Sequence, residues 1–114
     1  MLLVDDEEVA REAAAERLRE LGYHVLEAAD GPSAVRLLES GASIDMLVTD
    51  VGLPNGMNGR QVAEAVRERL PGIPLLFITG YAGMELPSKS EVLEKPFDLD
   101  ALARRIKLAL TQTK

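Results

Sequence analysis

Short apolar runs alternate along the chain with stretches of helical periodicity. The runs cover residues 1–4, 23–28, 44–49, 73–79 and, more weakly, 91–93. Strands that alternate with helices are typical of a parallel α/β sheet, because a crossover helix must carry the chain back before the next parallel strand. The pattern predicts an α/β fold with five strands. A length of 114 residues suits one domain over 1–114.

Four helical stretches are expected between and after these runs, each with apolar residues at intervals of three and four. Gly22 is placed to end the first in a left-handed conformation, and Pro32 suits the first position of the second. Asn58 and Asp98 are the expected N-caps of the third and the last. The four apolar faces are Ala10, Ala14, Leu18 and Leu21; Ala34, Leu37 and Leu38; Val62, Ala65 and Val66; and Leu99, Leu102, Ala103, Ile106 and Leu110.

The composition of the runs predicts the order of the strands. The first, third and fourth are almost wholly apolar, as strands covered on both faces are, whereas the second and fifth mix polar and apolar residues. Edges at strands two and five fit the doubly wound, flavodoxin-like order 2-1-3-4-5. Only 15 residues separate Thr79 from Lys95. The fifth strand takes some of them, so a helix of about 11 residues does not fit between the fourth and fifth strands. We expect the helix at this place, the fourth helix of a regular alternation, to be short or missing.

Composition excludes several classes of function. The net charge of −6 argues against binding to the phosphate backbone of nucleic acid. The absence of cysteine excludes disulfides, thiolate metal sites and a cysteine nucleophile. No apolar run approaches the roughly 20 residues of a membrane span, and no signal peptide is visible. We therefore expect a soluble, cytoplasmic domain that makes no membrane contact.

Polar side chains follow the carboxyl ends of four runs. Asp5 and Asp6 follow the first, Asp50 ends the third, Thr79 ends the fourth and Lys95 follows the fifth. Ligands bind at this edge of an open α/β sheet, where the strand order reverses between strands one and three. Three carboxylates there repel one another unless a cation or protons intervene. Oxygen ligands with open positions suit Mg²⁺, so the sequence predicts a magnesium site.

Each residue of this set also has an ordinary structural interpretation. Asp5 and Asp6 could cap the helix that follows them, Thr79 could simply end a strand, and Lys95 could be a surface lysine. Asp50 fits such an interpretation less well, because the next expected helix begins several residues later. The combination of these side chains on four separate strand ends favours a functional site.

Three further polar residues are assigned structural roles. Glu7 and Glu8 follow the acidic pair and are interpreted as residues of the first helical turn rather than as metal ligands. His24, the one histidine of the chain, is expected in the middle of the second strand, away from the predicted site. We assign it no part in the chemistry.

Four segments resemble the receiver domain of bacterial two-component response regulators. They are LVDDE at 3–7, TDVGLP at 49–54, FITG at 77–80 and EKPF at 94–97. They occur in the order of that family, and the resemblance covers nearly the whole chain. The segments LPNGMNG at 53–59 and FITGYA at 77–82 are most similar to the receivers of hybrid sensor histidine kinases.

The resemblance implies a phosphoacceptor domain rather than an enzyme that turns over a substrate. Asp50 would accept a phosphoryl group from a phosphohistidine, with Lys95 and Thr79 contacting the phosphoryl oxygens. Asp6, Asp50 and the backbone carbonyl of Gly52 would bind Mg²⁺ directly, and Asp5 would act mainly through a bound water.

The resemblance also implies a partner and a backbone feature. A histidine kinase or histidine phosphotransfer protein would dock over the cleft, against the first helix around 8–19. The bond between Lys95 and Pro96 would be cis. The beginning of the chain directly in the first strand fits a receiver excised from a longer kinase, and the oligomeric state is left open.

Two features depart from the family pattern. Val92 lies three residues before the lysine, where relatives usually carry Tyr or Phe. The shortened fourth helix removes part of the face that most relatives use for output. We hypothesise that the phosphorylation chemistry is retained while the usual readout is altered. Gly52 and Tyr81 occupy the positions that tune the lifetime of the acyl phosphate, which stays open.

Two other functions remain as alternatives. An aspartate-nucleophile phosphatase also attacks from an Asp at a strand end, but it usually has a second acid two residues later, where this chain has Gly52. A degenerate receiver would act only as a protein-binding module, and the presence of all five site residues argues against it. A nucleotide-binding module is less favoured, because no Gly-rich loop follows the first strand.

Overall fold

A computed structural model describes residues 1–80 and 91–111. In these residues five strands form one parallel sheet in the order β2-β1-β3-β4-β5, which confirms the predicted order. The strands are β1 (Leu2–Val4), β2 (Leu26–Ala28), β3 (Leu47–Asp50), β4 (Leu75–Thr79) and β5 (Glu91–Glu94). The helices are α1 (Glu8–Glu20), α2 (Gly31–Glu39), α3 (Gly59–Arg69) and α4 (Leu99–Thr111).

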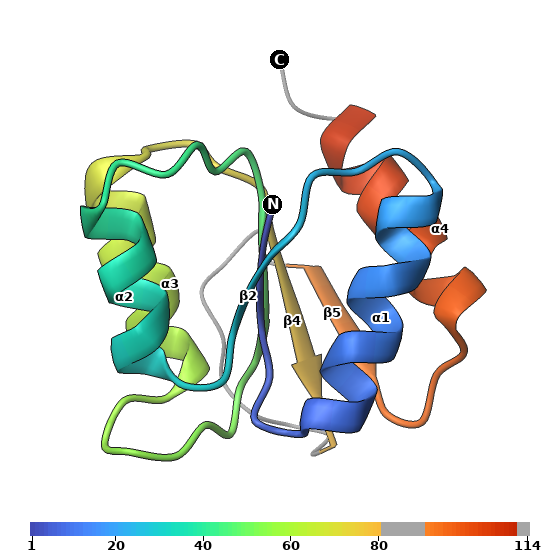
Figure 1. Ribbon diagram of the computed structural model, residues 1–114, viewed down its shortest axis with the longest axis horizontal. Helices are drawn as coiled ribbons and strands as arrows, with labels where there is room; N and C mark the ends of the chain where they lie inside the picture. The colour runs from blue at the N-terminus through green and yellow to red at the C-terminus, as the bar shows by residue number, and fades with distance from the viewer. Residues whose placement is uncertain (81–90, 112–114) are drawn as a thin grey trace.

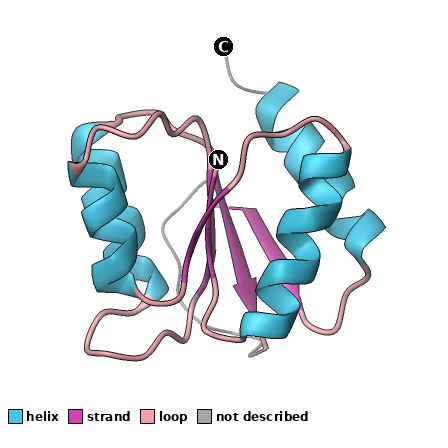
Figure 2. Cartoon of the chain, in the orientation of Figure 1, coloured by secondary structure: helices cyan, strands magenta, loops and turns pink. Residues whose placement is uncertain are grey.

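The sheet lies between two layers of helices. Figure 1 shows α2 and α3 on one face and α1 and α4 on the other, and Figure 2 shows the strands between the two layers. Alternate side chains of β1 point to opposite faces, so that Leu2 and Val4 join the cluster under α2 and α3 while Leu3 joins the cluster under α1 and α4. Both clusters exclude water from the faces of the sheet and fix the positions of the carboxyl ends of its strands.

Three strands begin later than the apolar runs predicted. Val25, Ile44 and Ile73 are buried but precede β2, β3 and β4. These residues are apolar because they pack in the core. They lie in the segments that lead into the strands and do not pair with a neighbouring strand. His24 consequently lies before β2 and is exposed, so its predicted place in the middle of a strand was wrong.

The N-caps predicted for the third and last helices are present, and α2 has an N-cap as well. The side chain of Asp30 accepts a hydrogen bond from the Ser33 N–H at 2.8 Å at the start of α2. Asn58 and Gln61 form a reciprocal capping box at α3. Asp98 accepts a hydrogen bond from the N–H of the third residue of α4.

The apolar face expected for the first helix was partly wrong. Ala14 and Leu18 are buried as predicted, but Ala15 is buried with them and Ala10 is exposed. Leu21 lies past the last residue of α1 and is 47% exposed. Gly22 then adopts a φ of +97°, as its predicted place at the end of the helix requires.

Two predictions concern the segment before the last helix. The shortened or missing fourth helix was expected in residues 80–90, of which 81–90 lie outside the described residues. Val92 is partly buried on β5, opposite Phe77 of β4, and packs against the cluster under α2 and α3. Among the helices of the described residues, none has the length and apolar character needed to cross a bilayer.

Candidate functional site

The acidic residues meet because β1 and β3 are neighbours in the sheet. Val4 lies opposite Thr49 in the parallel register, so the residues that follow, Asp5 and Asp50, come side by side at the carboxyl edge. Carboxylate oxygens of Asp5, Asp6 and Asp50 all lie within 4.8 Å of one another. Asp5 and Asp50 are only 6% and 7% exposed, whereas Asp6 is exposed.

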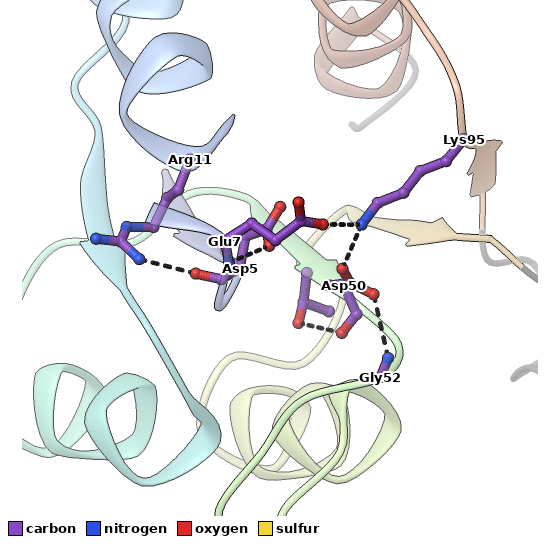
Figure 3. Close-up of polar contacts among 7 residues, drawn as sticks. Asp5, Glu7, Arg11, Asp50, Gly52 and Lys95 are labelled. Atoms are coloured by element: carbon purple, nitrogen blue, oxygen red, sulfur yellow. Dashed lines mark hydrogen bonds and ion pairs between the residues drawn. The ribbon is translucent and has the colours of Figure 1, made fainter. Parts of the chain in front are cut away.

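Asp50 is held by two donors from different parts of the chain (Figure 3). Its Oδ2 accepts a hydrogen bond from Lys95 Nζ at 2.7 Å, and its Oδ1 accepts one from the Gly52 N–H at 3.1 Å. The backbone N–H of Lys95 donates to the Thr79 carbonyl at 2.8 Å, which fixes the lysine beside the end of β4. The bond between Lys95 and Pro96 is cis, as predicted.

The charges of the cluster act on one another. Burial alone would lower the pKa of Lys95, but the hydrogen bond and the negative charge of Asp50, with the charge of Asp5, raise it above its usual range. Burial raises the pKa of Asp5, and the nearby carboxylates of Asp50 and Glu7 add to that rise. The hydrogen bond from the Glu7 N–H and the charge of Lys95 oppose it. The lysine is therefore charged, while the ionised form of Asp5 is disfavoured.

An open pocket of about 450 Å³ lies over this cluster. It contains five of the six predicted site residues, with Thr79 buried in its wall at 3% exposure. Asp5 belongs to the acidic cluster but lines the neighbouring groove between α1 and α4. The lining residues of the open pocket are Asp6, Glu7, Asp50, Gly52, Thr79, Gly80 and Lys95.

The sequence interpretation missed the contact that Glu7 makes in this pocket. Glu8 does lie in the first turn of α1, but Glu7 occupies the N-cap position without a side-chain cap bond. Its Oε1 lies 3.3 Å from Lys95 Nζ instead, as Figure 3 shows. The available signal was a third consecutive acid at a strand end that faces a predicted lysine.

The donor set fits a hard divalent cation. Three carboxylates approach one another, two of them buried, and Lys95 is the one cation that hydrogen-bonds to them among the described residues. An excess of negative charge in a site of oxygen ligands is the chemistry that Mg²⁺ binds, usually through one or two carboxylates and several waters. The acidic cluster at the predicted edge could therefore hold a divalent cation.

Replacing Asp5 by Asn is expected to stabilise the metal-free protein by about 1 kcal/mol near neutral pH. The pKa of Asp5 is raised in the folded state, so its ionisation costs stability once the pH exceeds the ordinary value. Asn keeps the oxygen that accepts the Glu7 N–H but carries no charge.

Urea unfolding with a chelator present measures this difference. The gain should shrink as the pH falls toward 3.8, the ordinary pKa of the carboxyl, because the wild-type side chain is then protonated as well. Equal stabilities of the two proteins at neutral pH would contradict the prediction. Added Mg²⁺ should reverse the order, since the wild type keeps all three carboxylates.

The comparisons with known proteins agree on one family. The sequence model of the response regulator receiver domain matches residues 1–107. The chain is 36% identical over 114 residues to the sensor kinase CckA of Brucella abortus, covering 94% of this chain and 12% of that protein. It is 33% identical to the response regulator receiver protein CpdR of the same organism, covering 96% of this chain and 95% of that one. The chain thus spans a small part of one relative and nearly all of the other.

Solved structures give the same result. The receiver domain of the hybrid histidine kinase CckA superposes with a TM-score of 0.84 at 41% identity, over 96% of each chain. A response regulator receiver protein from Sinorhizobium medicae gives a TM-score of 0.89 at 34% identity, over 96% of this chain and 92% of that one. The predicted likeness to receivers of hybrid kinases is confirmed by CckA. The chain belongs to the response regulator receiver domain family of two-component signalling proteins.

Proposed function

We propose that Asp50 is the phosphoacceptor of this receiver domain and takes a phosphoryl group from a phosphohistidine. The observation that carries the proposal is the contact of 2.7 Å between Lys95 Nζ and Asp50 Oδ2 at the buried end of β3. A carboxylate beside a fixed ammonium, open to a pocket, can receive a phosphoryl group whose oxygens need positive charge. Phosphoacceptance is the standard role of the family to which the chain belongs.

The reaction is a transfer between two nucleophiles. A carboxylate oxygen of Asp50 forms a bond to phosphorus while the P–N bond of the phosphohistidine breaks, and the electron pair of that bond stays on the imidazole nitrogen. Lys95 would pair with a phosphoryl oxygen as the charge moves from the carboxylate to the phosphate. The Thr79 hydroxyl, in the wall of the pocket, would donate to another phosphoryl oxygen.

Asp6, Asp50 and the backbone carbonyl of Gly52 would hold Mg²⁺ directly, and Asp5 would act mainly through a water. When bound, the ion offsets the repulsion between the carboxylates and the incoming phosphoryl oxygens. The close approach of the three carboxylates and the position of Gly52 in the pocket lining support this assignment.

The remaining assignments follow from the family. We propose that the domain covers 1–114, acts in the cytoplasm and serves as a phosphoacceptor that assists its own phosphorylation and dephosphorylation. Its partner would be a histidine kinase or a histidine phosphotransfer protein that docks over the pocket and against α1. Val92 can neither swing nor hydrogen-bond as the usual aromatic residue does, so the output step would differ from that of most relatives.

Incubation with Mg²⁺ and phosphoramidate, followed by intact-mass spectrometry, tests the proposal. The wild type should gain the mass of one phosphoryl group, and Asp50→Asn should gain none. Asp100→Asn is the matched control, because Asp100 is exposed on α4 and pairs with Arg17, and it should react like the wild type. A full mass gain in Asp50→Asn, or none in the wild type, would overturn the proposal. Turnover of a phosphomonoester that depends on Asp50 would favour the phosphatase alternative.

A further inference from the structure

The side chain of Arg11 connects the acidic cluster to the edge strand of the sheet. Arg11 lies in the first turn of α1, and its side chain is only 12% exposed. Its Nη1 donates to the backbone carbonyl of Asp5 at 2.9 Å, and its Nε donates to Oε1 of Glu27 on β2 at 3.2 Å. Figure 3 shows the first contact, on the side of Asp5 away from Lys95.

The carbonyl that Arg11 contacts belongs to the peptide unit between Asp5 and Asp6. The orientation of that planar unit sets how the two carboxylates leave the backbone. The N–H of Asp5 is bonded to the Ala28 carbonyl at 3.1 Å, and its carboxylate accepts the Glu7 N–H at 2.9 Å. The Arg11 bond therefore fixes the remaining polar group of Asp5, at the point where the chain turns from β1 toward α1.

Glu27 keeps the Arg11 guanidinium in this orientation. While Oε1 of Glu27 faces Arg11, its Oε2 lies 3.1 Å from Arg19 Nη1. Arg19 is held in turn by a bond from its Nη2 to the Val25 carbonyl at 2.6 Å. A guanidinium is a planar group with several donors and can bridge two acceptors at once, which a lysine ammonium on a flexible stem does poorly.

We infer that Arg11 is a positioning residue for the acidic cluster. With Glu27 as its anchor, it holds the peptide between Asp5 and Asp6 in the orientation that lets both carboxylates face a divalent cation. Arg11 contacts a backbone atom of a ligand residue and none of the carboxylates, so it acts on metal binding through geometry. This inference rests on the proposed function, because it assigns the ion of that site as the group that is positioned.

Titration with Mg²⁺, followed by the backbone amide NMR shift of Asp6, tests the inference. Arg11→Lys keeps the positive charge and most of the aliphatic side chain but loses the planar guanidinium that bridges two acceptors. We expect its affinity for Mg²⁺ to fall about tenfold, at the low end of the effects that supporting partners of metal ligands have. Arg17→Lys is the matched control on the same helix: Arg17 pairs with Glu20 and Asp100, and its loss should leave the affinity unchanged.

A double-mutant cycle identifies the route of the effect. Glu27→Ala should also weaken Mg²⁺ binding, because the guanidinium loses the side chain that anchors it. The double variant that also carries Arg11→Gln should bind Mg²⁺ as tightly as Arg11→Gln alone, since Glu27 acts on the cluster through Arg11. Additive losses, or an unchanged affinity in Arg11→Lys, would overturn the inference.

Hydrogen exchange in the presence of a chelator gives a readout without metal. The amide of Glu7, which donates to the Asp5 carboxylate, should exchange faster in Arg11→Lys by more than any change in the free energy of global unfolding accounts for. Unchanged exchange at Glu7 would overturn the positioning role. The wild type could take up no Mg²⁺ while the Glu7 amide still exchanges faster in Arg11→Lys. That result would overturn the proposed function and the link to a metal, but it would leave the Arg11 contact established.

Discussion

Gly59→Ala is expected to lower the free energy of unfolding by about 3 kcal/mol or more. Gly59 is the first residue of α3, and its N–H donates to the Val51 carbonyl at 2.9 Å. A Cβ at this position would clash with the backbone carbonyl of Asp50 and lie 2.9 Å from Val51 Cα. Because these are backbone atoms at the end of β3, the helix or the strand must shift to make room.

Gly31→Ala is the matched control for this substitution. Gly31 is the first residue of α2, as Gly59 is of α3, and the atoms nearest to a Cβ there are Cβ and Cγ of Met57 at 2.6 Å and its Sδ at 2.8 Å. The Met57 Cγ and Sδ can move by a change of rotamer, and its Cβ moves with the loop between β3 and α3 rather than with the sheet, so we expect a smaller loss of about 1 to 2 kcal/mol. Urea denaturation of both variants measures the difference. Similar losses at the two positions would show that the end of β3 can move away from α3, contrary to the prediction.

The order of the sheet could be predicted from composition, whereas the starts of the strands could not. Covered strands are apolar and edge strands are mixed, and this difference fixes which strands lie in the middle. Val25, Ile44 and Ile73 are as buried as strand residues, although they precede the strands. Burial makes a residue apolar whether or not its backbone pairs, so composition alone does not locate the first paired residue.

In the candidate site, too, some residues could be predicted from the sequence and others could not. Asp5, Asp50 and Lys95 could be placed together because the carboxyl ends of parallel strands share one edge. The contact of Arg11 could not be predicted, and that of Glu7 was indicated only by a third acid at the strand end, since each depends on the direction in which the first turn of α1 leaves that edge. In the sequence, an acid after the pair is typical of a helix start, and an arginine four residues later is typical of an exposed helix face.

Lys95→Met is expected to slow phosphorylation by a small phosphodonor about 100-fold at saturating Mg²⁺. Its Nζ lies 2.7 Å from Asp50 Oδ2, where it can neutralise charge that develops on the phosphoryl oxygens, and loss of one such donor typically costs this much or more. Lys107→Met, at an exposed lysine of α4, is the matched control and should react at the wild-type rate. The rate is measured as the loss of unmodified protein by intact-mass spectrometry.

A second measurement on Lys95→Met separates a role in the reaction from a role in building the site. In the absence of a phosphodonor, the ammonium competes with a metal ion for the Asp50 carboxylate, because both need its oxygens. Its removal should therefore tighten Mg²⁺ binding while the reaction slows. If Lys95 only held the pocket together, its loss would scatter the carboxylates, and metal affinity and rate would fall together. Opposite changes in the two quantities follow only when the lysine supports the transferring group rather than the cation site.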